Sequence, residues 1–171
     1  AAIKKMKLKI HLDKPTYAGM AILDLSKLHM YDFHYNIIKK KYGDKASLLF
    51  TDTDSLAYKI KCEDIYMDMK ESSDLFDLSN FPQDAEELTA HFFDKSNKKV
   101  LGKFKDECDG KPASSFVGLR PKMYSLKCGY DPKDEKKTAK GVKKSYAKTH
   151  IRHADYRRCL LKDDPNHNPQ Q

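Results

Sequence analysis

The strongest constraint on the fold is a pair of short apolar runs separated by four polar residues. Residues 46–50 read ASLLF and residues 55–60 read SLAYKI, with the letters TDTD between them. Two runs of this length, rich in aliphatic and aromatic side chains and joined by a short polar link, predict two strands in a hairpin. We therefore expect Asp52 and Asp54 to lie at the tip of a β-hairpin.

The residues before this hairpin predict one strand and one helix. Apolar residues alternate with Lys and His over residues 6–12, which is typical of a half-buried strand, and Pro15 ends the pattern. From Asp24, a candidate N-cap, apolar residues recur every three or four positions, which predicts an amphipathic helix that ends at Gly43. The apolar stripe of this helix consists of Leu28, Tyr31, Tyr35, Ile38 and Tyr42.

The residues after the hairpin contain further short segments separated by Pro and Gly. We expect helices in residues 63–70, 84–93 and 153–161, strands in residues 98–107, 114–119 and 122–130, a basic loop in residues 133–144 and a disordered tail in residues 163–171. This mixture predicts an α+β fold, with an antiparallel sheet and packed helices. A chain of 171 residues, 39% of them hydrophobic, is long enough for one domain with a core.

Charged residues are segregated along the chain. Lys and Arg number 33 against 25 Asp and Glu, which gives a net charge of +8. Residues 62–94 contain ten acids and one base, a net charge of −9, whereas residues 98–162 contain nineteen bases and seven acids, a net charge of +12. A basic segment interleaved with Gly, Tyr and Phe is typical of nucleic-acid binding, and a solvated lysine-rich surface has the same composition.

The cysteines and the apolar pattern argue against several classes of protein. Cysteines 62, 108, 128 and 159 form no C-x-x-C pair, so the sequence suggests neither a zinc site nor a disulfide framework. The first residues lack the continuous apolar region of a signal peptide, and no apolar stretch is long enough to span a bilayer. We expect reduced thiols, an intracellular location and no membrane partner.

Two aspartates one residue apart at a hairpin tip are suited to a divalent cation. Residues i and i+2 of an extended chain project to the same face, so Asp52 and Asp54 would converge on one point. A Mg²⁺ ion offsets the repulsion between the two carboxylates and keeps open positions for phosphate and water. The alternative is a structural turn, because aspartates also bind their own backbone, although TDTD lacks the Gly or Asn usual at such a tip.

Two motifs in this order resemble family-B DNA polymerases. FTDTDSLAY, in residues 50–58, is similar to the [YF]-x-D-T-D-S motif of the palm hairpin that carries metal-binding carboxylates in that family. RPKMYSL, in residues 120–126, resembles the Lys-x-Tyr element downstream of that hairpin. The wider pattern, from about Lys14 to Leu161, resembles the viral, organellar and mobile-element branch, whose better-known members start from a protein primer.

The resemblance implies catalytic and metal-binding roles at the hairpin tip. Asp54 matches the principal metal ligand of the family and Asp52 the accompanying acid, with Mg²⁺ or Mn²⁺ as the cofactor. Thr53 and Ser55 match the small polar residues that keep the turn tight. The implied reaction is two-metal nucleotidyl transfer from a dNTP to the 3′-hydroxyl of a primer.

The second motif implies contact with DNA. Lys122 and Tyr124 match residues that hold the primer near its 3′ end, the lysine as a donor to the duplex and the tyrosine through its hydroxyl and ring. Arg120, Lys143 and Lys144 are further DNA-binding candidates. The implied partners are primer–template DNA, a dNTP, the rest of the polymerase chain and a terminal protein primer.

The resemblance also implies a division of the chain. Residues 1–130 would be a partial palm domain with an acidic helical insertion at about 62–97, and residues 131–162 the start of a small basic thumb of hairpin and helix. The family's D-x-x-S-L-Y-P and K-x-x-x-N-S-x-Y-G motifs are missing from these residues. We therefore expect a C-terminal palm and thumb fragment that does not polymerise DNA at a useful rate alone.

Two other functions fit parts of the sequence. A basic nucleic-acid-binding module without catalysis would use Asp52 and Asp54 only to shape a turn. A glycosyltransferase-like domain also uses Asp-x-Asp to hold a divalent metal, but it needs a nucleotide-binding α/β region before the motif, and the excess positive charge suits a long polyanion better.

Overall fold

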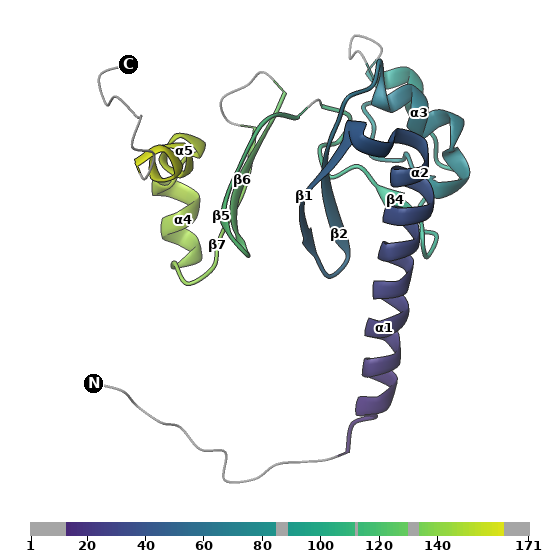
Figure 1. Ribbon diagram of the computed structural model, residues 1–171, viewed down its shortest axis with the longest axis horizontal. Helices are drawn as coiled ribbons and strands as arrows, with labels where there is room; N and C mark the ends of the chain where they lie inside the picture. Colours follow the sequence, from purple (N-terminus) through teal and green to yellow (C-terminus); the bar gives the residue numbers. More distant parts are fainter. Residues whose placement is uncertain (1–12, 85–88, 112, 130–133, 163–171) are drawn as a thin grey trace.

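The computed structural model describes residues 13–84, 89–111, 113–129 and 134–162. Within these residues two antiparallel sheets and one short parallel pair of strands are combined with helices, so the architecture is α+β. Figure 1 shows the layers from left to right: two C-terminal helices, a three-stranded sheet, a hairpin and a long N-terminal helix with the acidic segment. The strand expected in residues 6–12 and the tail expected in residues 163–171 lie outside the described residues.

The expected hairpin is confirmed. β1 (Ala46–Asp52) and β2 (Ser55–Ile60) pair in antiparallel register and are joined by a two-residue turn. A shift in register between Leu48 and Phe50 marks a β-bulge, which bends the strand and increases its twist near the tip. The hairpin thus presents its turn beyond the paired region.

The N-terminal helix begins earlier than the sequence pattern predicts. α1 (Thr16–Asp32) starts directly after Pro15 instead of after Asp24, so the assignment of Asp24 as an N-cap is wrong. Proline is tolerated at this position because its missing N–H would have no partner in the first turn of a helix. Ala18, Met20, Ala21 and Leu23, in the first two turns of α1, favour the helical conformation.

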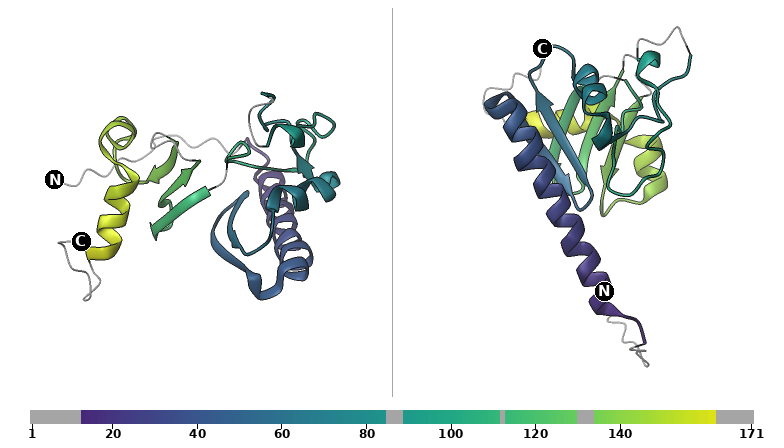
Figure 2. Two further views of the ribbon diagram at one scale, coloured as in Figure 1. Left: turned by 90° about the horizontal axis from the view of Figure 1, so that it is seen from above. Right: turned by 90° about the vertical axis from the view of Figure 1, so that its right-hand side faces the viewer.

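Only the C-terminal end of this helix is buried. It continues through a π-helical segment (Phe33–Ile38) and α2 (Lys39–Tyr42) and ends, as expected, at Gly43, where φ is +53°. The buried side chains are Met30, Phe33 and Ile38, whereas the predicted stripe residues Leu28, Tyr31 and Tyr35 are more than half exposed. The wider π turns shift the face that meets the hairpin, and the first turns of α1 extend beyond it (Figure 2).

The second antiparallel sheet contains two expected strands and one unexpected one. β5 (Ala113–Arg120) and β6 (Met123–Cys128) form a hairpin, and β7 (Glu135–Ala139) pairs with β6. The basic loop expected in residues 133–144 is therefore wrong over β7, because pairing with β6 overrides its polar composition. The domain boundary expected near residue 130 falls inside this sheet.

Two helices cover the outer face of this sheet. α5 (His153–Lys162) is the expected last helix, and α4 (Lys144–His150), for which the sequence analysis predicts no helix, begins at the last residue of the expected basic loop. Because side chains alternate along a strand, Tyr124 of β6 faces the β1–β2 hairpin while the next residue, Ser125, contacts His153 of α5. The sheet is thus covered on both faces.

The acidic segment has less helix than expected. α3 (Ile65–Glu71) is confirmed, with the carboxylate of its N-cap Asp64 accepting backbone N–H bonds. In the described part of the expected helix 84–93, only a 3₁₀ turn is present. Likewise the strand expected in residues 98–107 is reduced to β4 (Phe104–Lys105), parallel to β3 (Phe76–Asp77), because turns with positive φ at Lys99 and Gly102 interrupt it.

The core is divided into two small clusters. The first joins the helix to the hairpin and the second lies inside the acidic segment; their buried members are Phe33, Ile38 and Ala46, and Leu78, Phe81 and Phe92. None of the helices in the described residues is long and apolar enough to cross a membrane.

Candidate functional site

The tips of the two antiparallel hairpins meet. Both the β1–β2 turn and the β5–β6 turn point toward the same end of the molecule (Figure 1). The ammonium of Lys122, in the β5–β6 turn, lies 2.9 Å from a carboxylate oxygen of Asp52, at the end of β1. The structure therefore brings together the two motifs that the sequence analysis selected separately.

An aromatic layer supports this contact. The ring of Phe50, two residues before Asp52, stacks on the ring of Tyr124 with 4.3 Å between the centroids. It also stacks on Phe116 of β5, with the centroids 5.6 Å apart. A pocket of about 390 Å³ lies between the hairpins, lined by these rings together with Asp52 and Lys122. Stacked rings hold the two tips in register, because such pairs add directional stabilisation to their apolar contact.

The turn at the acidic tip is not extended. Thr53 has φ of +54°, and the N–H of Asp54 donates to the carbonyl oxygen of Asp52 at 2.6 Å. A bond from residue i+2 to residue i across a positive φ is the pattern of the rare, strained form of γ-turn. Asp52 and Asp54 therefore do not follow the side-chain alternation of an extended strand, because the chain reverses between them.

Ser55 and Thr53 both shape this turn. The Ser55 hydroxyl donates to the carbonyl oxygen of Asp52 at 3.2 Å, which closes the turn from the β2 side. Thr53 takes a backbone conformation that is unfavourable for a β-branched residue. Strain of this kind persists only where the surrounding structure enforces it.

The turn at the basic tip also contains a non-glycine residue at positive φ. The β5–β6 turn consists of Pro121 and Lys122, and Lys122 has φ of +58° where a turn of this type favours Gly or Asn. The carbonyl of Lys122 accepts the N–H of Lys140 at 3.0 Å, which ties the turn to the end of β7. The Lys122 backbone is thus fixed while its side chain, 48% exposed, reaches Asp52.

The hydroxyl of Tyr124 is kept protonated. Desolvation raises its pKa, and the negative charges of Asp52 and Glu107 raise it further, while Lys122 lowers it. A protonated phenol can donate a hydrogen bond to phosphate or sugar oxygen. Tyr124 therefore offers a donor at the edge of the pocket.

The side chains of the two aspartates differ in exposure and in their contacts. The side chain of Asp52 is 35% exposed and is paired with Lys122. Asp54 is exposed, and its carboxylate has no hydrogen bond or ion pair to any of the described residues. One carboxylate is thus held in place and the other projects into solvent.

Asp52 and Asp54 each carry the type of ligand that Mg²⁺ prefers. Mg²⁺ is commonly bound by one or two carboxylates together with substrate phosphates and waters. Over the described residues, no three His, Cys, Asp or Glu side chains lie close enough to form a metal site. The remaining oxygen ligands would have to come from phosphate, water or another polypeptide segment.

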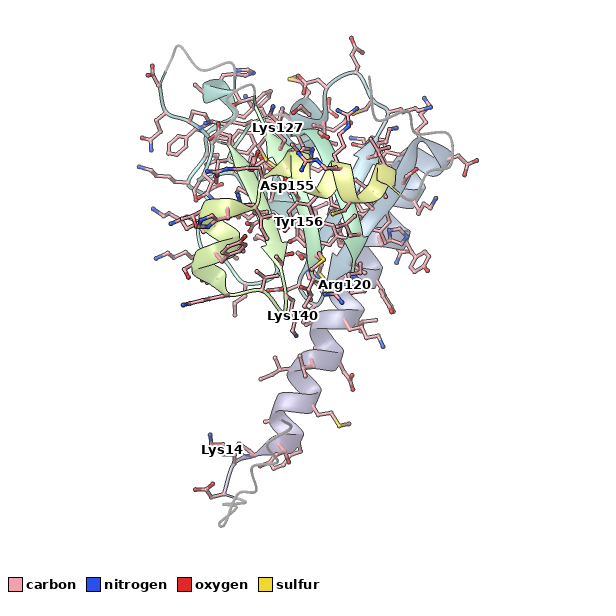
Figure 3. All side chains as sticks on the ribbon, turned by 90° about the vertical axis from the view of Figure 1, so that its left-hand side faces the viewer. Lys14, Arg120, Lys127, Lys140, Asp155 and Tyr156 are labelled. Carbon is pink, nitrogen blue, oxygen red and sulfur yellow. The ribbon has the colours of Figure 1, made fainter. Side chains whose placement is uncertain are left out.

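The other predicted DNA contacts lie around this end of the molecule. Figure 3 shows Arg120 and Lys140 at one end of the three-stranded sheet and Lys127 at the other. Lys143 and Lys144 are exposed at the start of α4, and no hydrogen bond or ion pair joins them to the Asp52–Lys122 pair. Sequence reasoning missed Lys140, and the only available signal was its place in a lysine-rich segment.

The geometry identifies one candidate site, at the paired tips. Asp52 and Asp54 carry carboxylate oxygens there, and Lys122 and Tyr124 carry hydrogen-bond donors. No protein-family model, curated protein or solved structure matches this chain. A functional assignment therefore depends on the residues and contacts described above.

Proposed function

We propose that this chain is the C-terminal palm and thumb-start portion of a family-B DNA polymerase and takes part in metal-dependent nucleotidyl transfer. The observation that supports this most is the contact between the hairpin tips, where Lys122 pairs with Asp52 and Phe50 stacks on Tyr124. The two motifs lie far apart in the sequence, and a shared reaction centre requires them to meet.

The reaction joins a primer 3′-hydroxyl to the α-phosphate of a dNTP. Divalent ions held at this site would supply activation of that hydroxyl and stabilisation of the pyrophosphate leaving group. Asp54, whose carboxylate is exposed, supplies the main metal-ligating oxygens, and Asp52 supports the same site. Thr53 and Ser55 hold the turn that separates them.

Lys122 has a second role in this proposal. Its ammonium neutralises Asp52 in the absence of a divalent cation, since the two groups form a 2.9 Å ion pair. If Asp52 held a divalent ion, Lys122 would lose this ion pair and its ammonium would be free to contact a primer phosphate. The hydroxyl of Tyr124 donates a hydrogen bond to the primer. Arg120, Lys143 and Lys144 extend the contact along the duplex.

The complete reaction needs further partners. A primer–template duplex and a dNTP are the substrates, and another part of the polymerase chain supplies the remaining carboxylate and the nucleotide-binding lysine. A terminal protein primer is a further partner within this proposal. Alone, the chain binds the duplex and metal but extends a primer poorly.

The test is a titration of a primer–template duplex into the chain with and without Mg²⁺ or Mn²⁺. Asp54→Asn should remove the metal-dependent part of binding, and Lys122→Ala should weaken binding mainly in the presence of the metal, where the ammonium is no longer paired with Asp52. Asp44→Asn and Lys127→Ala are matched controls, because these charged residues lie at the opposite ends of β1 and β6. Unchanged binding and metal response in both test variants would refute the proposal.

The basic module without catalysis is the second candidate. Exposed basic residues follow β7 into α4, at Lys140, Lys143, Lys144 and Lys148, which favours contact with a polyanion irrespective of the acidic tip. This function predicts that duplex binding falls when these lysines are replaced and stays the same in Asp54→Asn. The same titration distinguishes the two candidates.

A further inference from the structure

Two cysteines that the sequence pattern did not connect lie in contact. The Sγ atoms of Cys108 and Cys128 are 3.0 Å apart. Cys128 is the last residue of β6 and is buried, and Cys108 is half-buried in the turn that leads toward β5. The other two cysteines, Cys62 and Cys159, are exposed.

The backbone holds both cysteines where they meet. On one side, the carboxylate of Asp106 accepts the N–H of Cys108 at 2.9 Å and the N–H of Gly110 at 2.7 Å, which closes the turn. On the other side, the N–H of Cys128 donates to the carbonyl oxygen of Asp134 at 2.9 Å. These bonds hold the backbone at both cysteines, from which the two sulfur atoms reach each other.

We propose that Cys108 and Cys128 form an intramolecular disulfide when the protein meets a hydroperoxide. One thiol, as the thiolate, attacks the peroxide oxygen and becomes a sulfenic acid, releasing water or an alcohol. The second sulfur attacks the sulfenic sulfur and releases water, so one peroxide accepts two electrons and one S–S bond replaces two S–H bonds. The sulfur atoms need to approach by roughly 1 Å to reach bonding distance.

The surroundings make this bond slow to form and slow to break. Burial raises the pKa of Cys108, and the contact with Cys128 and the charge of Asp106 raise it further. A thiol that ionises reluctantly is a weak nucleophile at neutral pH and also a poor leaving group in thiol exchange. We therefore expect the disulfide to form slowly and to exchange slowly with other thiols.

The cross-link would clamp the base of the β5–β6 hairpin. Cys108 precedes β5 and Cys128 ends β6, so the closed loop contains the whole hairpin with Lys122 at its far end. Closing this loop restricts the unfolded chain and stabilises the folded one. The bond would form whether or not the hairpin tips bind nucleic acid.

The experiment compares the reduced full chain with the same chain treated with hydrogen peroxide. Intact mass should fall by two hydrogens, and a digest without reductant should contain one peptide that links Cys108 to Cys128. The unfolding midpoint should rise by roughly 5 °C on oxidation. The double variant Cys62→Ser/Cys159→Ser should behave like the wild type, because it retains the proposed pair.

Two single variants complete the test. In Cys108→Ser or Cys128→Ser the linked peptide and the midpoint shift should both disappear. The wild-type comparison stands even where a variant folds poorly, because both of its arms use the same chain. Oxidation confined to Cys62 and Cys159, a linkage that involves either of them, or a linked peptide with no rise in midpoint would overturn the proposal.

Discussion

The two hairpin tips share a turn length and differ in charge. Each is a two-residue turn with one non-glycine residue at positive φ, which is the first turn residue, Thr53, in one and the second, Lys122, in the other. The basic tip is committed to a contact, since Lys122 reaches Asp52, whereas Asp54 of the acidic tip has no partner among the described residues. In the proposed function, the acidic tip would take a ligand from outside, and Lys122 of the basic tip would exchange Asp52 for a phosphate.

The largest effect is expected from removing the free carboxylate. Asp54→Asn keeps the size of the side chain but removes the charge that binds a divalent ion. We expect Mn²⁺ affinity, measured by calorimetry, to fall roughly 100-fold or more, since even groups that only support a metal ligand are worth 10- to 100-fold. Asp44→Asn, an exposed acid at the other end of β1, should leave the affinity unchanged.

Equal metal affinity in Asp54→Asn and the wild type would show that the carboxylate of Asp54 binds no divalent ion. The acidic tip would then be a structural turn, and the basic module would become the better assignment. The stacked rings beneath the tips allow the contact between the two tips to be tested independently.

Phe50→Ala should uncouple the tips. It removes the ring that stacks on both Tyr124 and Phe116, at 4.3 Å and 5.6 Å between centroids. The free energy of unfolding should fall by about 2 kcal/mol, less than for a fully buried ring because Phe50 is half-buried. Urea denaturation measures this, and Phe50→Leu should retain most of the stability but not the ring stacking.

Duplex binding in Phe50→Ala tells whether the contact between the tips matters for function. Weaker binding in a variant that is still folded supports a shared site, because Lys122 and Tyr124 have lost their support. Unchanged binding would mean that the basic tip acts independently of the acidic one.

The hairpins could be predicted from the sequence, but their contact could not. The β1–β2 hairpin follows from two short apolar runs and a polar link, which are local signals. The pairing of Lys122 with Asp52 depends on how two distant hairpins pack, and no local pattern encodes that. The resemblance to a polymerase family selected both motifs without placing them together.

Three further differences between the predicted and the observed structure have physical causes. The basic composition of residues 133–144 predicts a loop, whereas β7 within them takes a strand conformation because it pairs with β6. The start of α1 was misplaced because Asp24 is a good N-cap residue, although here it lies inside the helix. The Cys108–Cys128 contact was missed because sequence spacing identifies adjacent cysteines and not those brought together by a turn and a strand end.

We expect an intermediate effect on duplex binding from replacing Lys122, the cation of the basic tip. Lys122→Ala should weaken duplex binding roughly tenfold and reduce the salt dependence of binding by about one phosphate contact. Fluorescence anisotropy over a range of salt concentrations measures both quantities. Lys127→Ala, at the other end of β6, should change neither by as much, and equal losses in the two variants would indicate unspecific contact with the whole basic surface.

The smallest effect should come from relaxing the acidic tip. Thr53→Gly removes a β-branched side chain from φ of +54°, which relieves roughly 1–2 kcal/mol of backbone strain, while the added freedom of glycine in the unfolded chain offsets roughly 0.5–1 kcal/mol. We therefore expect the free energy of unfolding to rise by roughly 0.5–1 kcal/mol. Thr51→Gly, inside β1 where φ is not positive, should instead lower it. If both variants lose stability equally, the turn stores no strain, and the similarity between the two tips does not extend to their energetics.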